Sequence, residues 1–381
     1  IGNNDLTPSG DPDWMDDTLN THPVVEFDGT GDEMTDADGI FGTNTIDEIT
    51  VFFVANRTST NNVWFFGEAT DAGDSDIRVS IENGGNHKWA LPEDDDIDIA
   101  NATSGWVVDK YNIHSAMASS DAARLALDGT DKFSYAMDGE EYGAKATHTT
   151  FTGNNSPFYI GANQAGADNY YGRLAEFFVY TEVPTDAELL QINTYLGIKY
   201  GITISNDTDG DGSPGEAKGS YEEGDYLATD STVVWDYSTT TATYHNDIAG
   251  IARDDKQDLG QIKGTSYSTD AIFTIEAEGE GTNAANSFVD MADKEYFIWG
   301  NNNGTATWGA TGTNAPAGYK RLDRVWRVEE NDGDVGTCTF YLDVNNNSFN
   351  LPGTGGNPFY LVYELSLIHI SAPTRPSQIS Y

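Results

Sequence analysis

The sequence is short of cysteine and of basic residues, and both shortages narrow what the chain can be. Its one cysteine, Cys338, excludes an internal disulfide and a cysteine-based zinc cluster. Cys338 alternates with Phe340 and Leu342, a pattern that favours a small buried residue over a nucleophile. Only 19 lysines and arginines stand against 62 aspartates and glutamates, so the formal net charge is -43. Such a chain repels phosphates and anionic lipids, and we expect neither nucleic acid nor membrane insertion.

Long apolar runs and familiar catalytic motifs are also missing. No stretch approaches the length of a membrane span. The sequence holds no HExxH pair, no GxSxG, no P-loop and no strand–GxGxxG–helix unit. It is rich in aromatic residues instead, with 8 Trp, 20 Tyr and 17 Phe. Rings in this number can build a hydrophobic core, so we predict a folded chain rather than a disordered acidic one.

Short β-runs separated by Asx–Gly turns make up most of the chain. "EITVFFVANR", "NVWFFGE" and "GRLAEFFVYTE" recur at the spacing of antiparallel sandwiches. Asp28-Gly29 and Asp138-Gly139 supply turn residues that tolerate a positive φ. Similar runs resume after residue 225, among them "DIAGIARDD" and "EYFIWGNN". We therefore predict an all-β chain with two sandwiches.

One long helical pattern interrupts the strands, in "PTDAELLQINTYLGIKYG". Thr185 with Glu188 three residues later forms a capping-box pattern, and Gly201 is a typical helix end. Four apolar or aromatic residues fall at helical spacing and predict one buried stripe: Leu189, Ile192, Leu196 and Tyr200. The predicted segments are a sandwich over 1–184, a closing helix over 185–202, an acidic joint over 203–224, a second β domain over 225–364 and a tail over 365–381.

Several of these runs resemble a known family. "HPVVEFDGTGDEM", "RLALDG" and "GRLAEFFVYTEVPTDAELLQINTYLGIKYGI" are similar to a bacterial laminin-G-like domain of the concanavalin A-like lectin/glucanase class. "DYLATDSTVVWD", "EYFIWGNN" and "RLDRVWRVEE" resemble an uncharacterised β domain that follows it in large secreted bacterial surface proteins. The resemblance implies a jelly roll, an extracellular or cell-surface location and a role in adhesion or carbohydrate contact. Measured against it, the first domain lacks its opening strand and the second its closing strand.

The C-terminal tail differs in character from the rest. "LSLIHIS", from Leu365 to Ser371, resembles an in-frame translation of the transposase end sequence used in sequencing libraries. Pro373-Thr374-Arg375 also fit a common extension of that sequence. We therefore expect residues 365–381 to be non-native, with a native basic tail as the alternative.

The acidic joint contains a candidate calcium site. Asp207, Asp209 and Asp211 alternate and are followed by Gly212, as in the first half of a calcium loop. The twelfth position is Lys218 rather than the bidentate Glu of an EF-hand. A later carboxylate can take its place only if the chain folds back, and the candidates are Glu216, Glu222, Glu223 and Asp225. The predicted metal ligands are Asp207, Asp209, Asp211 and Glu216. We expect structural Ca²⁺ that fixes the angle between the two domains, with a solvated linker as the alternative.

Catalysis by carboxylates is the next question, because concanavalin A-like folds include glucanases. Their strand pattern is Glu-x-Asp-x-x-Glu, and Glu26 and Asp28 fit it. The third carboxylate position is Gly31, so the acid/base partner of a retaining glycosidase is missing. We therefore expect no catalytic residue and no enzyme activity.

Carbohydrate contact remains, because sugar faces stack on aromatic rings and sugar hydroxyls bond to Asn and Asp. Two segments, "GNHKWALPE" and "ANQAGADNYYGR", offer the predicted ligand-binding residues: Trp89, Asn163, Asp168, Asn169, Tyr170 and Tyr171. The alternative is that the rings pack in the core or at its rim. We expect a non-catalytic adhesion or binding module for a glycan, matrix or cell-surface ligand. The alternatives are a carbohydrate-binding module attached to an enzyme and, less favoured, a glycoside hydrolase.

Overall fold

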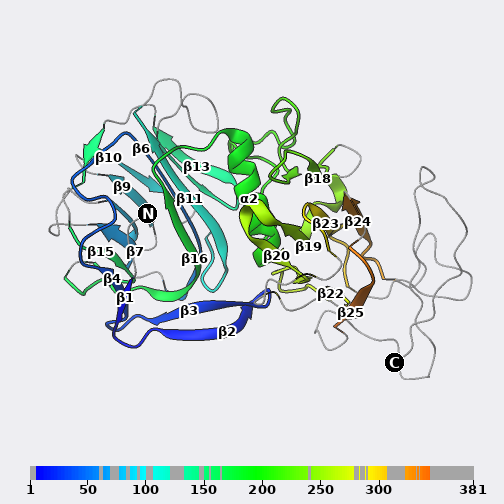
Figure 1. Cartoon of the computed structure of the whole chain (residues 1–381), viewed down its shortest axis with the longest axis horizontal. Coiled ribbons are helices and arrows are strands. Elements are labelled where there is room, and N and C mark those ends of the chain that lie inside the picture. The colour runs from blue at the N-terminus through cyan, green and yellow to red at the C-terminus, as the bar shows by residue number, and fades with distance from the viewer. Residues whose placement is uncertain are drawn as a thin grey trace, which may run out of the picture.

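Two seven-stranded antiparallel sheets lie face to face in the N-terminal half of the chain (Figure 1). The first sheet has the order β1 (Thr7–Ser9), β4 (Glu33–Asp36), β15 (Phe158–Ile160), β7 (Val63–Glu68), β8 (Ile77–Glu82), β9 (Asn86–Leu91) and β10 (Asp95–Ile99). The second has the order β13 (Glu140–Lys145), β12 (Phe133–Met137), β11 (Asn112–Ser119), β6 (Glu48–Arg57), β16 (Tyr171–Tyr180), β3 (His22–Asp28) and β2 (Asp13–Leu19). β5 (Thr45–Ile46) and β14 (Phe151–Thr152) form a short separate ladder.

This computed structural model describes residues 6–343 with gaps at 60–62, 69–76, 83–85, 92–94, 100–105, 121–132, 146–149, 154–155, 164, 239–241, 279–282, 284–287, 289–290, 307–321, 332 and 334. The predicted strand "RLALDG", the end of the second β domain from 344 to 364 and the tail over 365–381 lie outside the described residues. In the described part of the chain, no helix is both long and apolar enough to cross a membrane.

Strand β6 shows why the two sheets stack. Phe53 and Ala55 point into the core between the sheets, whereas Phe52 and Val54 belong to a second apolar cluster on the outer face. Successive side chains of a strand alternate between faces, so a strand with apolar residues at both parities is buried on both sides. The outer face of the second sheet must therefore be covered by another part of the chain.

Helix α2 (Asp186–Tyr200) provides that cover and carries both predicted caps. Thr185 and Glu188 form the reciprocal capping box, and Gly201 ends the helix with φ +68°, in the left-handed region. The prediction of a single buried stripe was too narrow. Asn193 and Thr194 are buried as well, because α2 lies between the sandwich and the C-terminal half.

The C-terminal half is built from three smaller antiparallel sheets. A four-stranded sheet has the order β20 (Leu259–Gln261), β19 (Asn246–Asp254), β23 (Glu295–Asn301) and β24 (Trp326–Asn331). A three-stranded sheet has the order β21 (Lys263–Thr265), β22 (Phe273–Ala277) and β25 (Cys338–Leu342), and β17 (Tyr226–Leu227) pairs with β18 (Val233–Trp235). Two short 3₁₀ helices are η1 (Ala242–Tyr244) and η2 (Asp255–Gln257). The prediction of an all-β fold with one connecting helix is confirmed for the described residues. Cys338 is only partly buried, against the prediction of a buried residue.

One apolar cluster joins both halves through the helix. Phe52 of the sandwich, Leu196 and Ile198 of α2, and Ile248 and Ile298 of the C-terminal sheet all belong to it. Buried side chains that interdigitate this way hold their elements in one arrangement. Apolar packing therefore holds the two halves in one arrangement, the role predicted for a cation in the acidic segment.

A polar contact reinforces this packing at the turn between β2 and β3. The Asn20 carboxamide donates to the carbonyls of Ile198 (3.2 Å) and Lys199 (3.0 Å) at the end of α2. Its oxygen accepts a hydrogen bond from the Thr265 amide at 2.8 Å. Asn20 thus satisfies two helix-end carbonyls that have no partner within the helix.

Candidate functional site

The three alternating aspartates of the acidic segment do converge. One carboxylate oxygen from each of Asp207, Asp209 and Asp211 lies within 4.8 Å of the others. The side chains also fold the loop, because Asp207 accepts from the Gly212 amide (2.9 Å) and Asp211 from the Ser213 amide (2.7 Å). Gly212 has φ +89°, a conformation that favours glycine, which explains its place after the third aspartate.

Lys218, which replaces the EF-hand glutamate, points back into this loop. Its ammonium lies 3.0 Å from Asp209 Oδ2 and 3.3 Å from Glu223 Oε1. Burial lowers the pKa of Lys218, but the hydrogen bond to Asp209 and the charge of Glu223 outweigh it and raise the pKa. The lysine is therefore a tethered counter-ion for the acidic loop.

Glu223, rather than Glu216, is the later carboxylate that folds back. Its side chain is fully buried and accepts from Thr208 Oγ1 at 2.6 Å. Glu216 lies outside the aspartate cluster, with 48% of its side chain exposed and its carboxylate 4.0 Å from the Lys218 ammonium. The chain reverses at the short β-bridge between Ala217 and Glu222. This reversal brings the next residue, Glu223, back to the loop that carries the three aspartates. Three of the four predicted metal ligands are thus brought together.

The fit of this loop to a divalent cation can be judged from its oxygens. Asp207 Oδ1 is buried and has no hydrogen-bond partner among the described residues, which is a costly state for a carboxylate oxygen. A hard cation would satisfy it, and three carboxylates at this spacing suit Ca²⁺. Lys218 holds one oxygen of Asp209, so the cation and the lysine compete for that group.

The acidic loop packs against the sandwich rather than hanging free. Its Ser205 amide donates to the Asp138 carbonyl at 2.6 Å, and Glu141 donates to the Thr208 carbonyl at 3.0 Å. Burial raises the pKa of Asp138 to about 6, although its carboxylate accepts from the Ile113 amide. A cavity of about 20 Å³, room for a single water, lies between this turn and the helix; Asn193 and Glu223 are among the residues that line it.

Two of the predicted glycan contacts are core residues. Trp89 is fully buried and stacks on Phe133 with 5.7 Å between ring centroids. Tyr170 is also buried, and its hydroxyl donates to the Asn56 carbonyl. The expectation that these two rings reach the surface is therefore wrong. The sequence of a single strand does not show whether a tryptophan on it faces the core or the solvent.

The other four predicted contacts lie on or beside one loop. Asn163 is buried and organises the turn, accepting from the amides of Ala165 and Ala167 and donating to Asp168. Asp168 is exposed and Asn169 is half-buried. Tyr171 begins β16 and is 42% exposed, so it is the one predicted ring that can meet a ligand.

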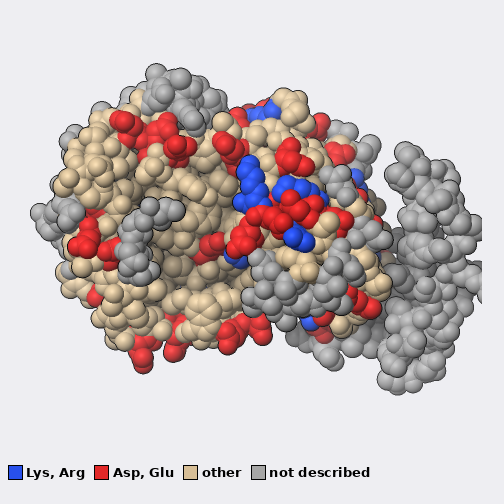
Figure 2. Space-filling view, viewed as in Figure 1, with Lys and Arg blue, Asp and Glu red and all other residues tan. Residues whose placement is uncertain are grey.

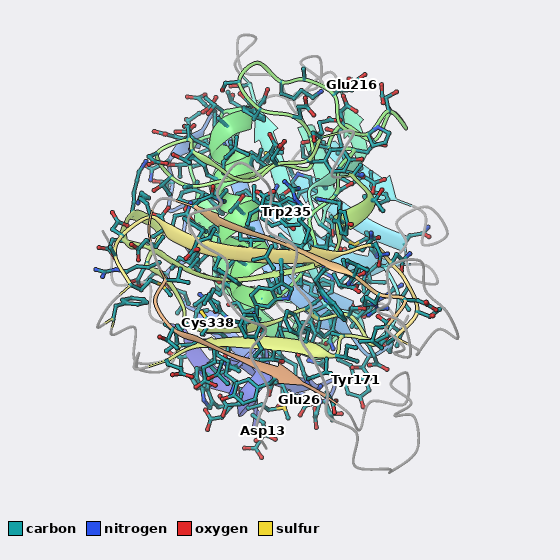
Figure 3. All side chains as sticks on the ribbon, turned by 90° about the vertical axis from the view of Figure 1, so that its right-hand side faces the viewer. Asp13, Glu26, Tyr171, Glu216, Trp235 and Cys338 are labelled. Carbon is teal, nitrogen blue, oxygen red and sulfur yellow. The ribbon has the colours of Figure 1, made fainter. Side chains whose placement is uncertain are left out.

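Tyr171 belongs to a surface that we call the β3–β16 patch: Asp13, Glu26, Asp28, Tyr171 and Arg173. Glu26 lies between Asp13 and Arg173 in cross-strand register, and Asp28 lies opposite Tyr171. Arg173 donates from Nε (3.1 Å) and Nη2 (2.9 Å) to Glu26 Oε1. Figure 3 shows Asp13, Glu26 and Tyr171 together at one end of the molecule and Glu216 at the other.

The carboxylates that resemble a glucanase motif have structural partners. Glu26 is paired with Arg173, and Asp28 Oδ1 accepts from the Thr30 amide at 2.6 Å. The nearby Asp32 is buried and accepts from the amides of Asp11 (2.7 Å) and Asp28 (2.8 Å). A retaining glycosidase needs a free nucleophile and a proton donor on opposite sides of the bond. Asp28 and Asp32 thus hold the turn after β3, and Glu26 links β3 to β16.

One exposed ring escaped the sequence prediction. Trp14 in β2 is 66% exposed, and its Nε1 donates to Asp16 Oδ1 at 2.7 Å. The signal was present in "DPDWMDDT", because a tryptophan flanked on both sides by aspartates is badly placed for a core.

Comparison with known proteins gives one family and several distant folds. Residues 188–366, just under half of the chain, match a family described as a domain of unknown function, DUF8202. This match begins inside α2, so it takes in the helix and the acidic loop together with the C-terminal half. No curated protein matches the chain.

Three solved structures illustrate the distant likeness. Domain 4 of AbnA, a GH43 extracellular arabinanase from Geobacillus stearothermophilus in complex with arabinotriose, is 14% identical, with 47% of this chain and 80% of that chain covered and a TM-score of 0.35. A heptameric SAP-like pentraxin from Limulus polyphemus is 13% identical, with 52% and 86% covered and a TM-score of 0.33. Domains LG4-5 of the mouse laminin alpha1 chain are 16% identical, with 41% and 40% covered and a TM-score of 0.31. Likenesses this distant carry no argument about function.

Proposed function

We propose that the chain is a non-catalytic extracellular binding module and that a glycan is its ligand. The observation that carries this proposal is the β3–β16 patch, where the exposed Tyr171 ring lies on the same sheet surface as the Glu26–Arg173 pair. An aromatic face stacks on the apolar face of a sugar ring, and fixed carboxylate and guanidinium groups bond to its hydroxyls.

The rigidity of the patch favours binding further. Its residues come from three adjacent strands of one sheet, and the Gly29 turn packs against Tyr171, where an added Cβ would lie 3.0 Å from Tyr171 Cβ. Sites built on strands are held more accurately than sites on loops, so less ordering is lost when a ligand binds. Asp168, three residues before Tyr171, is also exposed.

A glycan array followed by calorimetric titration of any hit tests the proposal. Tyr171→Ala should weaken binding by about tenfold, as expected for the loss of a stacking ring. Tyr180→Ala is the matched control, because Tyr180 is 46% exposed at the other end of the same strand and should bind as the wild type does. Silence across the array, or equal affinity for Tyr171→Ala and the wild type, would count against the patch.

We further propose that Asp207, Asp209 and Asp211 bind a structural Ca²⁺. The convergence of the three carboxylates and the buried Asp207 Oδ1 support this assignment. Because Lys218 competes for Asp209, we expect a weak affinity, about 10⁻⁴–10⁻³ M, as in extracellular modules. Since apolar packing fixes the two halves, the ion would order the acidic loop against the β12–β13 turn rather than set a domain angle.

A further inference from the structure

A second surface lies on β2, the terminal strand of the second sandwich sheet. Among the described residues β2 pairs only with β3, and most of its side chains from Asp13 to Asp17 are exposed. Trp14 lies on this strand opposite Val25 and is the most exposed large hydrophobic side chain of the described residues, at 66%. The bond from its indole N–H to Asp16 fixes the ring in place. A large ring held in water without covering side chains is unusual in a core-building sequence.

The charged residues that flank Trp14 in sequence are all acidic. Four aspartates flank it in sequence, and all lie at the surface: Asp11, Asp13, Asp16 and Asp17. The first basic residue of the whole chain is Arg57, so no lysine or arginine of this segment offsets them. Figure 2 shows acidic side chains in a row along the lower edge of the molecule, where Figure 1 places β2 and β3.

We propose that this edge docks a lysine- or arginine-bearing extended segment of a partner protein. A cation is attracted to the face of an indole ring, and carboxylates on either side strengthen that attraction. A purely apolar partner would bury the aspartates without compensation, and an anionic partner would be repelled. The negative charge of the aspartates and the aromatic face of Trp14 therefore both favour a cationic partner.

Recognition at this edge rests on side chains more than on backbone pairing. The register between β2 and β3 shifts between Met15 and Leu19, so only the first part of β2 is a regular strand. Such an irregularity limits the length of any added strand. The partner segment is accordingly short, with cationic side chains that reach Trp14 and the flanking aspartates.

Fluorescence anisotropy with a labelled peptide of alternating lysine and threonine tests the proposal. Alternation puts the lysines on one face of an extended chain, and titration at about 20 mM and about 150 mM salt measures the electrostatic part. Trp14→Ala should weaken binding roughly fivefold. Asp13→Asn combined with Asp16→Asn should weaken it too and reduce its dependence on salt.

Two controls make the outcome decisive. Tyr180→Ala removes a comparably exposed ring elsewhere, and Tyr171→Ala removes the proposed glycan contact; both should bind the peptide as the wild type does. Equal affinity of Trp14→Ala and the wild type would show that the peptide responds only to the overall charge of the chain and would overturn the proposal. Because Trp14 is exposed, melting temperatures should be unchanged, and Trp14→Phe should restore part of the affinity.

Discussion

Leu196→Ala tests whether the two halves unfold as one unit. Leu196 is fully buried in α2, in the cluster that also contains Phe52 of the sandwich and Ile298 of the C-terminal sheet. Removing its three outer carbons leaves a cavity lined by both halves. If the cluster couples them, the loss destabilises both together, and calorimetry records one transition that moves to lower temperature.

The size of the shift follows from the burial. A fully buried Leu→Ala change costs roughly 3–4 kcal/mol when the surroundings cannot collapse. Unfolding entropy of about 2.1 cal/mol/K per residue gives roughly 0.8 kcal/mol/K for 381 residues. The melting temperature should therefore fall by about 4–5 °C.

The matched control is Ile81→Ala, which truncates a side chain equally buried in the sandwich core and distant from the helix. Differential scanning calorimetry of both variants should show the same single transition shifted by similar amounts. Two separate transitions, with Ile81→Ala moving only one of them and Leu196→Ala the other, would refute the shared-core reasoning.

Three further changes address charged groups. Lys218→Met removes the ammonium from Asp209 and should tighten Ca²⁺ binding in calorimetric titration. Asp207→Ala should abolish the heat of Ca²⁺ binding. Unchanged Ca²⁺ affinity of Lys218→Met would exclude competition between the lysine and the ion. Lys294→Met leaves the buried Asp254 carboxylate without its cation, although Thr229 and Tyr296 still donate to it. The free energy of unfolding from denaturant titration should fall by about 3–5 kcal/mol. The surface change Lys263→Met should lower it by less than about 1 kcal/mol. Burial lowers the pKa of His87 to about 3, so the unfolded chain binds the proton first and stability is lost as the pH falls below about 6.5, by about 2 kcal/mol at about pH 5. His87→Phe should remove that loss. The difference between the variant and the wild type isolates His87, because the other titrating groups, among them Asp138, Asp225 and Glu329 with raised pKa values, are present in both proteins; parallel pH profiles of the two proteins would contradict the prediction.

Local patterns in the sequence predicted local structure well. Thr185, Glu188 and Gly201 marked the helix because caps satisfy backbone groups within a few residues of themselves. The strands β6 and β16 were likewise indicated by short runs of β-branched and aromatic residues between turn residues. The three aspartates converged because a tight turn joins them.

Contacts between residues that are far apart in the chain could not be predicted from local sequence patterns. The alternation around Trp89 is compatible with either face of a sheet, and only the partner sheet decides that the ring is buried. The choice of Glu223 over Glu216 depends on a chain reversal at Ala217, which no residue spacing indicates. The burial of α2 on two sides depends on β11 of the sandwich and on β17, β19 and β20 of the C-terminal half, and nothing in the helix sequence identifies either surface.

The position of the acidic loop limits what an ion there can do. The ion would bind beside the shared apolar cluster, with Lys218 already compensating Asp209 and Glu223 in its absence. A ligand stabilises the folded chain by RT ln(1 + [L]/Kd), so a site with a Kd of about 10⁻³ M gives only about 1.4 kcal/mol at about 10 mM Ca²⁺. A chelator should therefore lower the melting temperature by about 2 °C and increase proteolysis within 205–216, while leaving a single calorimetric transition. Splitting of that transition on chelation would return the cation to the role of holding the two halves together.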